Sequence, residues 1–341
     1  MHLNLGDRGI ILGATAAAAT GGILTAFVWY KRWKSSRPPE KWVKIGEVGG
    51  LYLYPIKSCK AIKAKALECT ELGCKLGELR DRMFVVVNEE GTFVTGREYP
   101  QLTQVEASMN EGKFRLCCAS HAETVDIDFH ALEGSPQKVR IWNAPAEGID
   151  CGDAAARWLS RLVLLRDSGL RLLYYGDRTA PKGMNPKLKK ALKLTGKDFK
   201  GTDASFFSDA AAYHLISEVS VGELNGRLEN ENVSPLNFRP NIVVRGEKLF
   251  PFEEDNWDWV KIGDVVFRFL SPCGRCLFTT IDPENSNKSD KYEPVTTLKK
   301  YRFMRNSVVR DVFKSPAMGI YLGARSTGSV SVGDDVMIPL S

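Results

Sequence analysis

Short runs of alternating apolar residues, separated by turn residues, occupy most of the chain from Trp42 onward and constrain its fold more than any other feature. Alternation with a period of two is typical of strands that bury one face. The segment MFVVVNEEGTFVTGRE predicts a hairpin whose turn is Asn88–Gly91. Further strands are expected in VGGLYLYPIKS, FRLCCAS, TVDIDF, QKVRIWN and RPNIVVRG. Two later segments, WVKIGDVVFRFLS with its turn at Gly263–Asp264 and GSVSVGDDVMI, predict hairpins of the same shape.

Helical patterns are few. Residues 152–165 (GDAAARWLSRLVLL) predict a helix with Asp153 as its N-cap. A short helix is expected from Ser220, because Ser220 and Glu223 have the spacing of a capping box. The sequence therefore predicts a β-rich α+β fold, with a barrel-like domain over residues 41–170 and a second barrel with a few helices over residues 171–341.

Residues 10–30 contain no charged side chain and would form a helix about 30 Å long, the thickness of a bilayer core. The cationic residues that follow are Lys31, Arg32, Lys34 and Arg37. This asymmetry places the rest of the chain in the cytosol. A cleaved signal peptide would carry its basic flank upstream, and a buried core helix would have a polar face. We therefore expect residues 1–40 to be an N-terminal transmembrane helix and a spacer stiffened by Pro38 and Pro39.

Composition excludes several classes of protein. Hydrophobic residues make up 43% and charged residues 26% of the chain, which is typical of a globular protein. A net charge of +6 without a basic helix predicts no nucleic-acid partner. Eight cysteines in 341 residues are too sparse for a disulfide framework, so a reducing compartment is expected. The four histidines lack ligand spacing, which argues against a histidine-based zinc or iron site.

The sharpest local motif is SPCGRCLFTTIDP, which contains Cys273 and Cys276 and follows a predicted strand. A zinc site would need a second ligand pair, and a thioredoxin-like pair would need a βαβ setting. Two buried structural cysteines and a thiolate bound to a soft, high-valent metal are the remaining interpretations. Arg275, between the cysteines, would lower the pKa of a thiolate and attract an anionic cofactor.

Other polar residues cluster at predicted strand ends, where Arg, Lys, Ser and Asn side chains suit phosphate or polar heterocycles. They are Lys57, Ser58, Lys60, Arg80, Arg82, Arg97, Asn237, Arg239 and Asn241. Taken singly, each is more simply explained as a solvated surface residue. Asp209 precedes an apolar strand and is a candidate proton relay or a turn residue.

Together these motifs resemble the MOSC superfamily, named for the C-terminal domain of molybdenum-cofactor sulfurases. Within it, the chain is most similar to the mitochondrial amidoxime reducing components. The resemblance covers nearly the whole chain and rests on YPIKSCK, LRDR, DCGDAAARW, FSDAAAYHLISE, NFRPNIVV, the Cys-Gly-Arg-Cys segment with TTIDP, and SPAMGIY. It implies an N-terminal MOSC-associated barrel-like domain followed by a MOSC barrel domain.

The resemblance also implies a molybdenum–molybdopterin cofactor (Moco), with Cys276 as the metal ligand and Asp209 as a catalytic carboxylate near the metal. The cofactor-binding residues that it implies are Lys57, Ser58, Arg82, Asp209, Ala210, Ala211, Arg239, Asn241, Gly274, Arg275, Cys276 and Tyr321. Relatives can carry hydroxyl residues where this chain has Ala210 and Ala211. A phosphate contact at that point would therefore come from backbone N–H groups.

The activity implied by the resemblance is reduction of small N-hydroxylated compounds, such as amidoximes, hydroxylamines and N-hydroxyguanidines. Since the sequence shows no convincing dinucleotide loop or iron–sulfur spacing, an external electron donor is expected. The resemblance implies that this donor is a cytochrome b5-type haem protein supplied by an NADH-cytochrome b5 reductase. A basic docking face is expected at Lys182, Lys187, Lys189, Lys190 and Lys193. The implied location is the mitochondrial outer membrane, single-pass and facing the cytosol. The alternatives are a cofactor carrier or sulfur-transfer protein of the same superfamily, and a non-enzymatic membrane tether.

Overall fold

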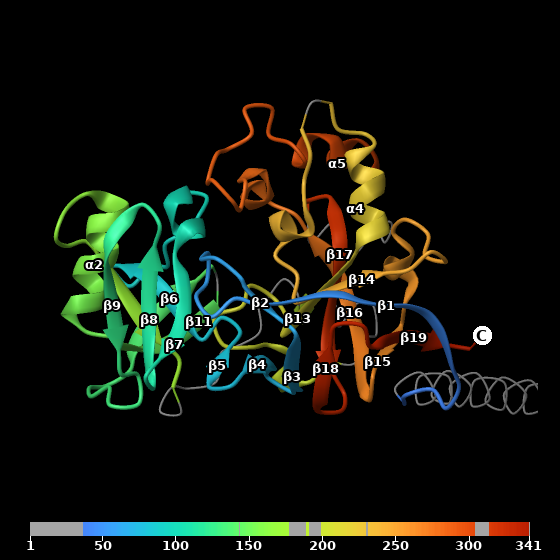
Figure 1. Cartoon of the computed structure of the whole chain (residues 1–341), viewed down its shortest axis with the longest axis horizontal. Coiled ribbons are helices and arrows are strands. Elements are labelled where there is room, and N and C mark those ends of the chain that lie inside the picture. Colours follow the sequence, from blue (N-terminus) through green and yellow to red (C-terminus); the bar gives the residue numbers. More distant parts are fainter. Residues whose placement is uncertain are drawn as a thin grey trace, which may run out of the picture. The chain divides into compact units, whose positions relative to one another are not determined.

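The computed structural model describes residues 37–142, 144–176, 189–190, 199–229, 231–303 and 314–340 (Figure 1). Residues Lys41–Ser341 belong to one compact unit. The predicted transmembrane segment, residues 10–30, lies outside the described residues. No helix of the described part of the chain is long and apolar enough to span a membrane. The longest, α2, has 12 residues and reaches about 18 Å, so the fold class is corrected to a mainly β protein with short helices.

A closed sheet forms the larger half of this unit. Its strand order is β14 (Ile242–Arg245), β13 (Tyr213–Ser217), β17 (Ala317–Ala324), β16 (Val265–Gly274), β15 (Trp259–Ile262), β19 (Asp335–Pro339), β1 (Trp42–Leu53) and β2 (Ile62–Ala64). Strand β1 also pairs with β14, and this pairing closes the sheet. Strands β13 and β14 are parallel, whereas the other pairs are antiparallel.

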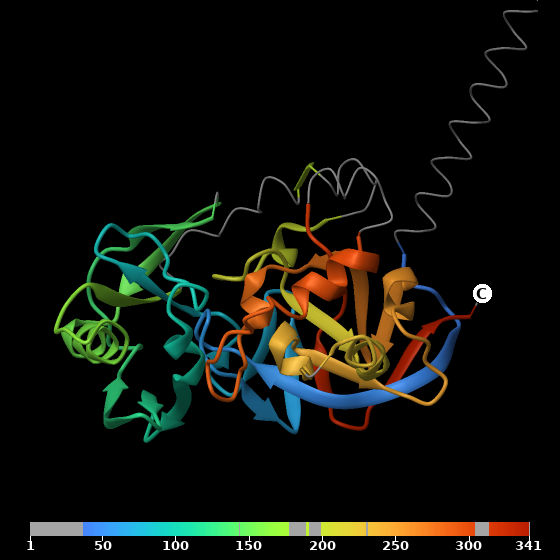
Figure 2. The same ribbon diagram turned by 90° about the horizontal axis from the view of Figure 1, so that it is seen from above.

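Three smaller sheets complete the described strands, and Figures 1 and 2 place β6 to β12 beside the closed sheet. The first sheet contains β10 (Gln137–Ile141), β11 (Ala144–Asp150), β12 (Leu170–Tyr174) and β6 (Phe84–Asn88). The second contains β18 (Gly328–Ser331), β3 (Ala66–Thr70), β4 (Gly73–Leu76) and β5 (Leu79–Arg80). The third contains β7 (Glu106–Asn110), β8 (Lys113–Cys118) and β9 (His121–Ile127).

The helices in the described part of the chain are short. The described α-helices are α2 (Asp153–Leu164), α4 (Glu218–Asn225) and α5 (Val295–Tyr301). The 3₁₀ turns are η1 (Pro100–Gln104), η2 (Gly201–Asp203), η3 (Pro235–Phe238), η4 (Glu253–Asn256) and η5 (Leu277–Thr280). Helix α2 packs on β9 and β12 through Trp158 and Leu159, which are buried on one helix face. This face follows the 3.6-residue period that predicted the helix.

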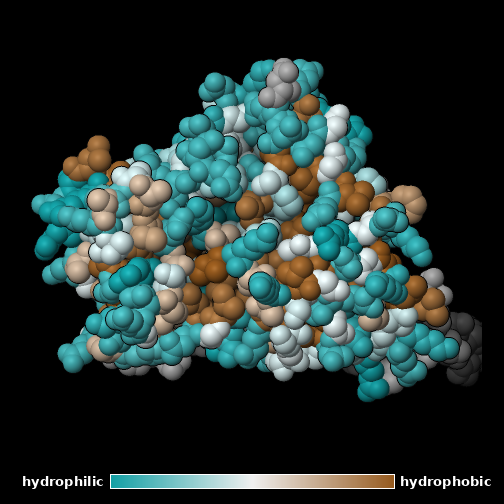
Figure 3. Space-filling model, viewed as in Figure 1, coloured by the Kyte–Doolittle hydropathy of each residue, from teal (hydrophilic) through white to brown (hydrophobic). Residues whose placement is uncertain are grey.

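One continuous apolar core joins the halves. It includes Leu51 of β1, Phe84 of β6, Phe114 of β8, Leu159 of α2 and Phe267 of β16. The rings of Phe84 and Phe114 stack with centroids 4.2 Å apart. On the face shown in Figure 3, hydrophilic residues predominate and apolar ones gather toward the middle of the view. The shared core fixes the strand ends of both halves against one another, and those ends carry the site described below.

Several local predictions are confirmed. The turn at residues 88–91 exists, with Asn88 N–H donating to the carbonyl of Thr92 at 2.9 Å and Gly91 at φ +71°. The turn at Gly263 joins β15 to β16, with φ +53° at that glycine. The second arm of the first hairpin is shorter than predicted, because it pairs through the isolated bridge Val87–Phe93.

Three local predictions are wrong. The N-cap of α2 is Gly152, and Asp153 instead pairs with Arg171 at 3.0 Å. Helix α4 begins at Glu218, and Ser220, inside the helix, donates from its Oγ to the Glu254 carboxylate. Strands β18 and β19 do not form a hairpin, because β18 pairs with β3 while β19 pairs with β1 and β15. In each case a partner distant in sequence replaces the local interaction.

Candidate functional site

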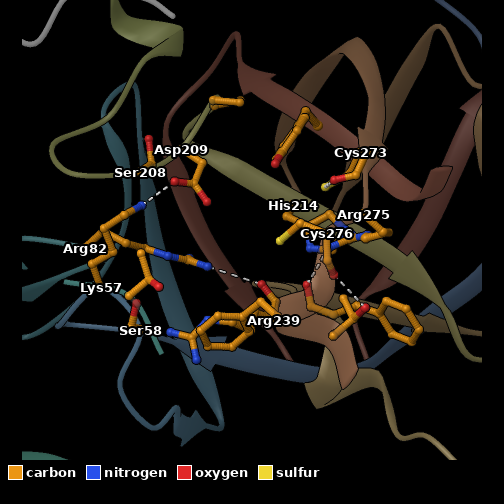
Figure 4. Close-up of a pocket in the computed structure, with 18 of the residues that line it drawn as sticks. Lys57, Ser58, Arg82, Ser208, Asp209, His214, Arg239, Cys273, Arg275 and Cys276 are labelled. Atoms are coloured by element: carbon orange, nitrogen blue, oxygen red, sulfur yellow. Dashed lines mark hydrogen bonds and ion pairs between the residues drawn. The ribbon is translucent and has the colours of Figure 1, made fainter. Parts of the chain in front are cut away.

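One pocket brings together the side chains that the sequence singled out (Figure 4). It encloses about 870 Å³ of space, part of which is open to solvent. The expected site residues all line it: Lys57, Ser58, Arg82, Asp209, Ala210, Ala211, Arg239, Asn241, Gly274, Arg275, Cys276 and Tyr321. Convergence from loops so far apart in sequence is a property of the fold and not of any single motif.

The labelled side chains of Figure 4 fall into two groups across the cavity. We call Lys57, Ser58, Arg82 and Arg239 the basic wall. These residues follow β1, precede β6 and follow η3. We call residues 273–276, at the end of β16 and the start of η5, the cysteine wall. Asp209, just before β13, lies beside Lys57 at the edge of the basic wall.

The basic wall stands on strained backbone. Ser58, Arg82 and Arg239 have φ values of +71°, +53° and +54°, a left-handed region that side chains other than glycine rarely adopt. Each such residue costs roughly 1–3 kcal/mol, so the surrounding structure must hold it in place. Arg82 is held by its own backbone, since its N–H donates to Tyr54 at 2.7 Å and its carbonyl accepts from Phe207 at 3.0 Å. Strain of this kind concentrates at functional sites.

A buried carboxylate, Asp81, organises the wall from behind. Its Oδ1 accepts the Tyr54 N–H at 3.0 Å and the Asn241 amide at 2.9 Å, and its Oδ2 pairs with Arg82. Both polar atoms of the Asn241 side chain form hydrogen bonds within the protein, because its Oδ1 also accepts the His214 N–H at 3.1 Å. Asn241 therefore lines the pocket chiefly as a support of Arg82. Asp81 was not among the site residues predicted from the sequence, although it lies inside the LRDR motif.

Arg239 has hydrogen-bonding capacity to spare. Its guanidinium stacks over the rings of Tyr54 and Phe278, at 4.2 and 5.2 Å from their centroids. Its buried Nη2 has no hydrogen-bond partner among the described residues. Burial lowers the pKa of Arg239 to about 10, which leaves the group charged at neutral pH. A buried, charged donor without an acceptor is costly unless a ligand supplies one.

The Asp209 carboxylate accepts hydrogen bonds from two side-chain donors. Lys57 Nζ donates to Oδ1 of Asp209 at 2.5 Å and to the Phe207 carbonyl at 3.0 Å. The Trp142 indole N–H donates to the same Oδ1 at 2.7 Å. Burial lowers the pKa of Lys57, and the ion pair with Asp209 opposes this shift. The side chain of Asp209 is 56% exposed, so solvent reaches a carboxylate that the protein holds in one orientation.

The two cysteines of the cysteine wall differ in exposure. Cys273 is 2% exposed, and burial raises the pKa of its thiol while Tyr321 hydrogen-bonds to it. Cys276 is exposed and stands at the N-cap of η5 with φ −116°. The thiolate is the form that binds metals, and a buried thiol with a raised pKa resists deprotonation. Of the two, only Cys276 has both solvent access and a place on the pocket surface.

Arg275, unlike Arg239, uses its guanidinium inside the protein. Nε donates to the Met318 carbonyl at 2.8 Å and Nη1 to the Phe238 carbonyl at 2.9 Å, while Nη2 also meets His214 Nε2. Burial, and next the charge of Arg275, lowers the pKa of His214 well below its usual range, so the imidazole is neutral and accepts this hydrogen bond. Although Arg275 lines the pocket, its guanidinium mainly holds the end of β16 against Phe238, Met318 and His214.

The segment Ala210–Ala211 offers backbone donors. Neither N–H donates a hydrogen bond to another described residue, whereas Ala212 N–H donates to the Asp203 carbonyl at 2.8 Å. Both alanines line the pocket. Free backbone N–H groups beside a basic wall suit an anionic ligand.

Family comparisons agree with this architecture. Residues 45–166 match the MOSC N-terminal beta barrel domain, and residues 202–337 match the MOSC domain. The human mitochondrial amidoxime-reducing component 1 is 34% identical over 327 residues, 96% of this chain and 93% of the relative. The chain belongs to the MOSC-domain family that contains these proteins.

Other relatives of the MOSC family are similarly close. The zebrafish (Danio rerio) mitochondrial amidoxime-reducing component 1 is 38% identical over 89% of this chain and 88% of its own length. The Bos taurus mitochondrial amidoxime reducing component 2 is 35% identical over 89% and 87%. A solved Bacillus subtilis structure, the YUAD protein, aligns over 87% of this chain and 98% of its own at 10% identity and a TM-score of 0.34, which is too low to carry an argument.

Not every polar residue that the sequence predicted at a strand end lines this pocket. Arg97 and Asn237 line it, whereas Lys60 pairs with Glu106 at 2.7 Å and Arg80 lies over the Phe206 ring. Of the expected basic docking face, Lys189 and Lys190 are described and exposed, and Lys182, Lys187 and Lys193 lie outside the described residues. The pocket is also lined by Phe93, Trp142, His214 and Phe278. The sequence did not predict these residues as part of the site, because isolated aromatic residues resemble ordinary core positions.

Proposed function

We propose that this MOSC-family chain is a molybdenum-cofactor-dependent reductase of N-hydroxylated compounds. The observation that carries the proposal is one exposed cysteine, Cys276, in a pocket whose opposite wall holds cationic donors. The names of the relatives, amidoxime-reducing components, support the choice of substrates. The substrates we propose are amidoximes, hydroxylamines and N-hydroxyguanidines.

The pocket fits the proposed cofactor in charge. Among the described residues that line it, Asp209 alone carries a carboxylate, against the cationic side chains of Lys57, Arg82 and Arg239. Arg239 Nη2 and the backbone N–H groups of residues 210 and 211 are donors with no acceptor among the residues that the structure describes. This donor set suits a phosphate-bearing heterocycle. When bound, a molybdenum cofactor supplies the two-electron chemistry that removes the substrate oxygen.

The protein offers few metal ligands of its own. Within the part of the chain that is described, no group of three His, Cys, Asp or Glu side chains is placed to hold a metal ion. A metal here would therefore need ligands from a cofactor, with Cys276 adding one soft thiolate. Cys273, buried beside Tyr321, would support that loop without binding the metal.

Asp209 is proposed as the proton relay. Lys57 and Trp142 fix its Oδ1, and its exposure to solvent gives protons a route into the pocket. A carboxylate so placed can carry a proton to the leaving oxygen as water forms. Asn241 and Arg275 position neighbouring groups through the hydrogen bonds described above.

We also propose that electrons arrive from a cytochrome b5-type haem protein fed by NADH-cytochrome b5 reductase. The net charge of +6 suits an acidic donor. The exposed Lys189 and Lys190 are the described members of the proposed docking face. The relatives' names favour a mitochondrial location, and a reducing compartment such as the cytosolic side of the outer membrane suits eight free cysteines.

The test is a pair of matched variants. Purified chain made with ample cofactor is analysed for molybdenum and pterin and assayed for benzamidoxime reduction with a chemically reduced dye. We expect stoichiometric molybdenum in the wild type and loss of more than about 100-fold in activity in Cys276→Ser, beyond the effect of losing an outer-shell partner. Cys273→Ser should keep both molybdenum and most of the activity.

Other outcomes would redirect the proposal. Full activity in Cys276→Ser would remove the metal-ligand role. Well-folded protein that holds cofactor but reduces nothing would favour a cofactor carrier, and activity that requires cysteine as a sulfur donor would favour a sulfur-transfer protein. Protein that never holds molybdenum would contradict all three cofactor-based functions.

A further inference from the structure

Trp142 adopts a conformation that its own sequence does not favour. It sits in the turn that follows β10, where the Ile141–Ala144 pair begins the ladder with β11. Its φ is +54°, and tight turns of this kind normally use glycine or asparagine. A bulky aromatic residue in this region is an outlier that the surroundings must impose. The reason for a tryptophan here must therefore lie in what its ring contacts.

Those contacts come from three residues in two other segments of the chain. The indole N–H donates to Asp209 Oδ1 at 2.7 Å, on the oxygen that Lys57 also holds. The ring of Phe93 meets the Trp142 ring edge-on, with centroids 4.9 Å apart at 75°. The Arg97 guanidinium lies over the Trp142 ring at 4.5 Å from its centroid. Residues far apart in sequence thus hold one indole rigidly beside the proposed proton relay.

This indole is also available to a ligand. Trp142 is 39% exposed, and it lines the pocket together with Phe93, Arg97 and Asp209. An exposed aromatic ring fixed by a hydrogen bond and a stacked guanidinium loses little entropy when a ligand packs on it. We call Phe93, Arg97 and Trp142 the aromatic wall.

We infer that the aromatic wall determines substrate specificity, and that Trp142 favours flat, conjugated N-hydroxylated compounds over saturated ones. The inference rests on the proposed reductase function. A conjugated group gains offset stacking on the indole that a saturated ring cannot match. Asp209, at the foot of the wall, accepts the N–H groups that an amidine-type head carries. The aromatic wall therefore selects the organic part of the substrate, while the cysteine wall faces the N–O bond.

Two substitutions separate the ring from its hydrogen bond. Trp142→Gly removes the ring at a φ that glycine tolerates. Trp142→Phe keeps a flat ring but removes the N–H that holds Asp209. Tyr292→Gly is the matched control, because Tyr292 is also an exposed aromatic residue with positive φ (+56°) and is absent from the described pocket lining.

The measurement is steady-state kinetics of the full, cofactor-loaded chain with benzamidoxime and with N-cyclohexylhydroxylamine. We expect Trp142→Gly to raise the benzamidoxime KM about tenfold, the loss of one good stacking contact, and to change the N-cyclohexylhydroxylamine KM less than about twofold. Trp142→Phe should keep most of the KM selectivity while kcat falls for both substrates. Tyr292→Gly should change neither KM nor kcat. Equal KM changes for both substrates in Trp142→Gly, or none, would overturn the inference.

A binding experiment separates this inference from the proposed reaction. Calorimetry measures the affinity of the full chain for benzamidine and for cyclohexylamine, which needs no turnover. The wild type should prefer benzamidine, and Trp142→Gly should lose most of that preference. If the wild type reduces neither substrate, the reductase proposal fails, while the benzamidine preference still decides the role of Trp142. A preference that survives in Trp142→Gly contradicts the role whatever the activity.

Discussion

The basic wall contains the partly buried Arg239 and the cysteine wall contains the buried Arg275, and the two arginines use their hydrogen-bond donors differently. Arg275 donates to the carbonyls of Met318 and Phe238 and meets the neutral His214. Arg239 stacks on Tyr54 and Phe278 and leaves Nη2 without a partner among the described residues. An arginine in a pocket is therefore not by itself a ligand-binding group. What matters is how many of its five N–H donors the protein has already used.

The backbone explains the difference. Arg275 immediately follows β16, and its N–H donates to the Pro316 carbonyl at 2.8 Å, which holds it against the start of β17 and its carbonyls. Arg239 ends η3 in a left-handed conformation that lifts its side chain toward the cavity. The strained residue is the one with free donors, as expected where strain serves binding.

The largest effect that sharpens this comparison is on stability. Arg275→Met leaves the Met318 and Phe238 carbonyls and His214 without their buried donor. We expect it to lower the free energy of unfolding of the cofactor-free chain by about 3–5 kcal/mol, as for other broken buried charge networks. Urea unfolding followed by tryptophan fluorescence measures it.

The control for this change is Arg245→Met, because Arg245 pairs with Glu47 at the surface, where such a pair contributes about 0–1 kcal/mol. If Arg275→Met kept its stability and lost only cofactor, Arg275 would be a binding residue like Arg239. The contrast between the two walls would then fail.

A smaller effect is expected in cofactor retention. Arg239→Met removes the donor that faces the cavity, so cofactor affinity should fall by about 1.5–3 kcal/mol, the contribution of a charge-assisted hydrogen bond. Molybdenum per protein after extended dialysis measures the loss. Unfolding of the cofactor-free chain should change by less than about 1 kcal/mol, since no described partner loses a hydrogen bond from Nη2. A large loss of stability without loss of cofactor would reverse the roles given to the two arginines.

The smallest effect concerns the backbone donors beside the basic wall. Ala210→Ser adds a hydroxyl next to N–H groups that have no described acceptor. We expect cofactor to dissociate more slowly, with a gain of about 0.5–1.5 kcal/mol for one added hydrogen bond. Ala122→Ser, at an exposed position of β9, is the control and should change nothing. Faster dissociation from Ala210→Ser would mean that the anion does not lie against this segment.

Local signals account for the predictions that were confirmed. The turns at Gly91 and Gly263 need a positive φ, and helix α2 needs one apolar face. Both requirements depend on residues that are close together in the sequence. The failed predictions, for Asp153, Ser220 and residues 328–338, each involve a side chain or strand that found a distant partner. The convergence of the expected site residues on one pocket agrees with the motif resemblance, which carried information on tertiary contacts that periodicity lacks.

The sequence by itself determined the period of the strands, the position of the Cys-Gly-Arg-Cys segment and the set of polar residues at strand ends. The tertiary structure decided which of these residues still have hydrogen-bonding capacity for a ligand. The acceptors of Arg275 lie 37 and 43 residues away, and the partner of the Trp142 indole lies 67 residues away. Burial depends on the same distant neighbours, so the exposure of Cys276 beside a buried Cys273 became visible only in the fold.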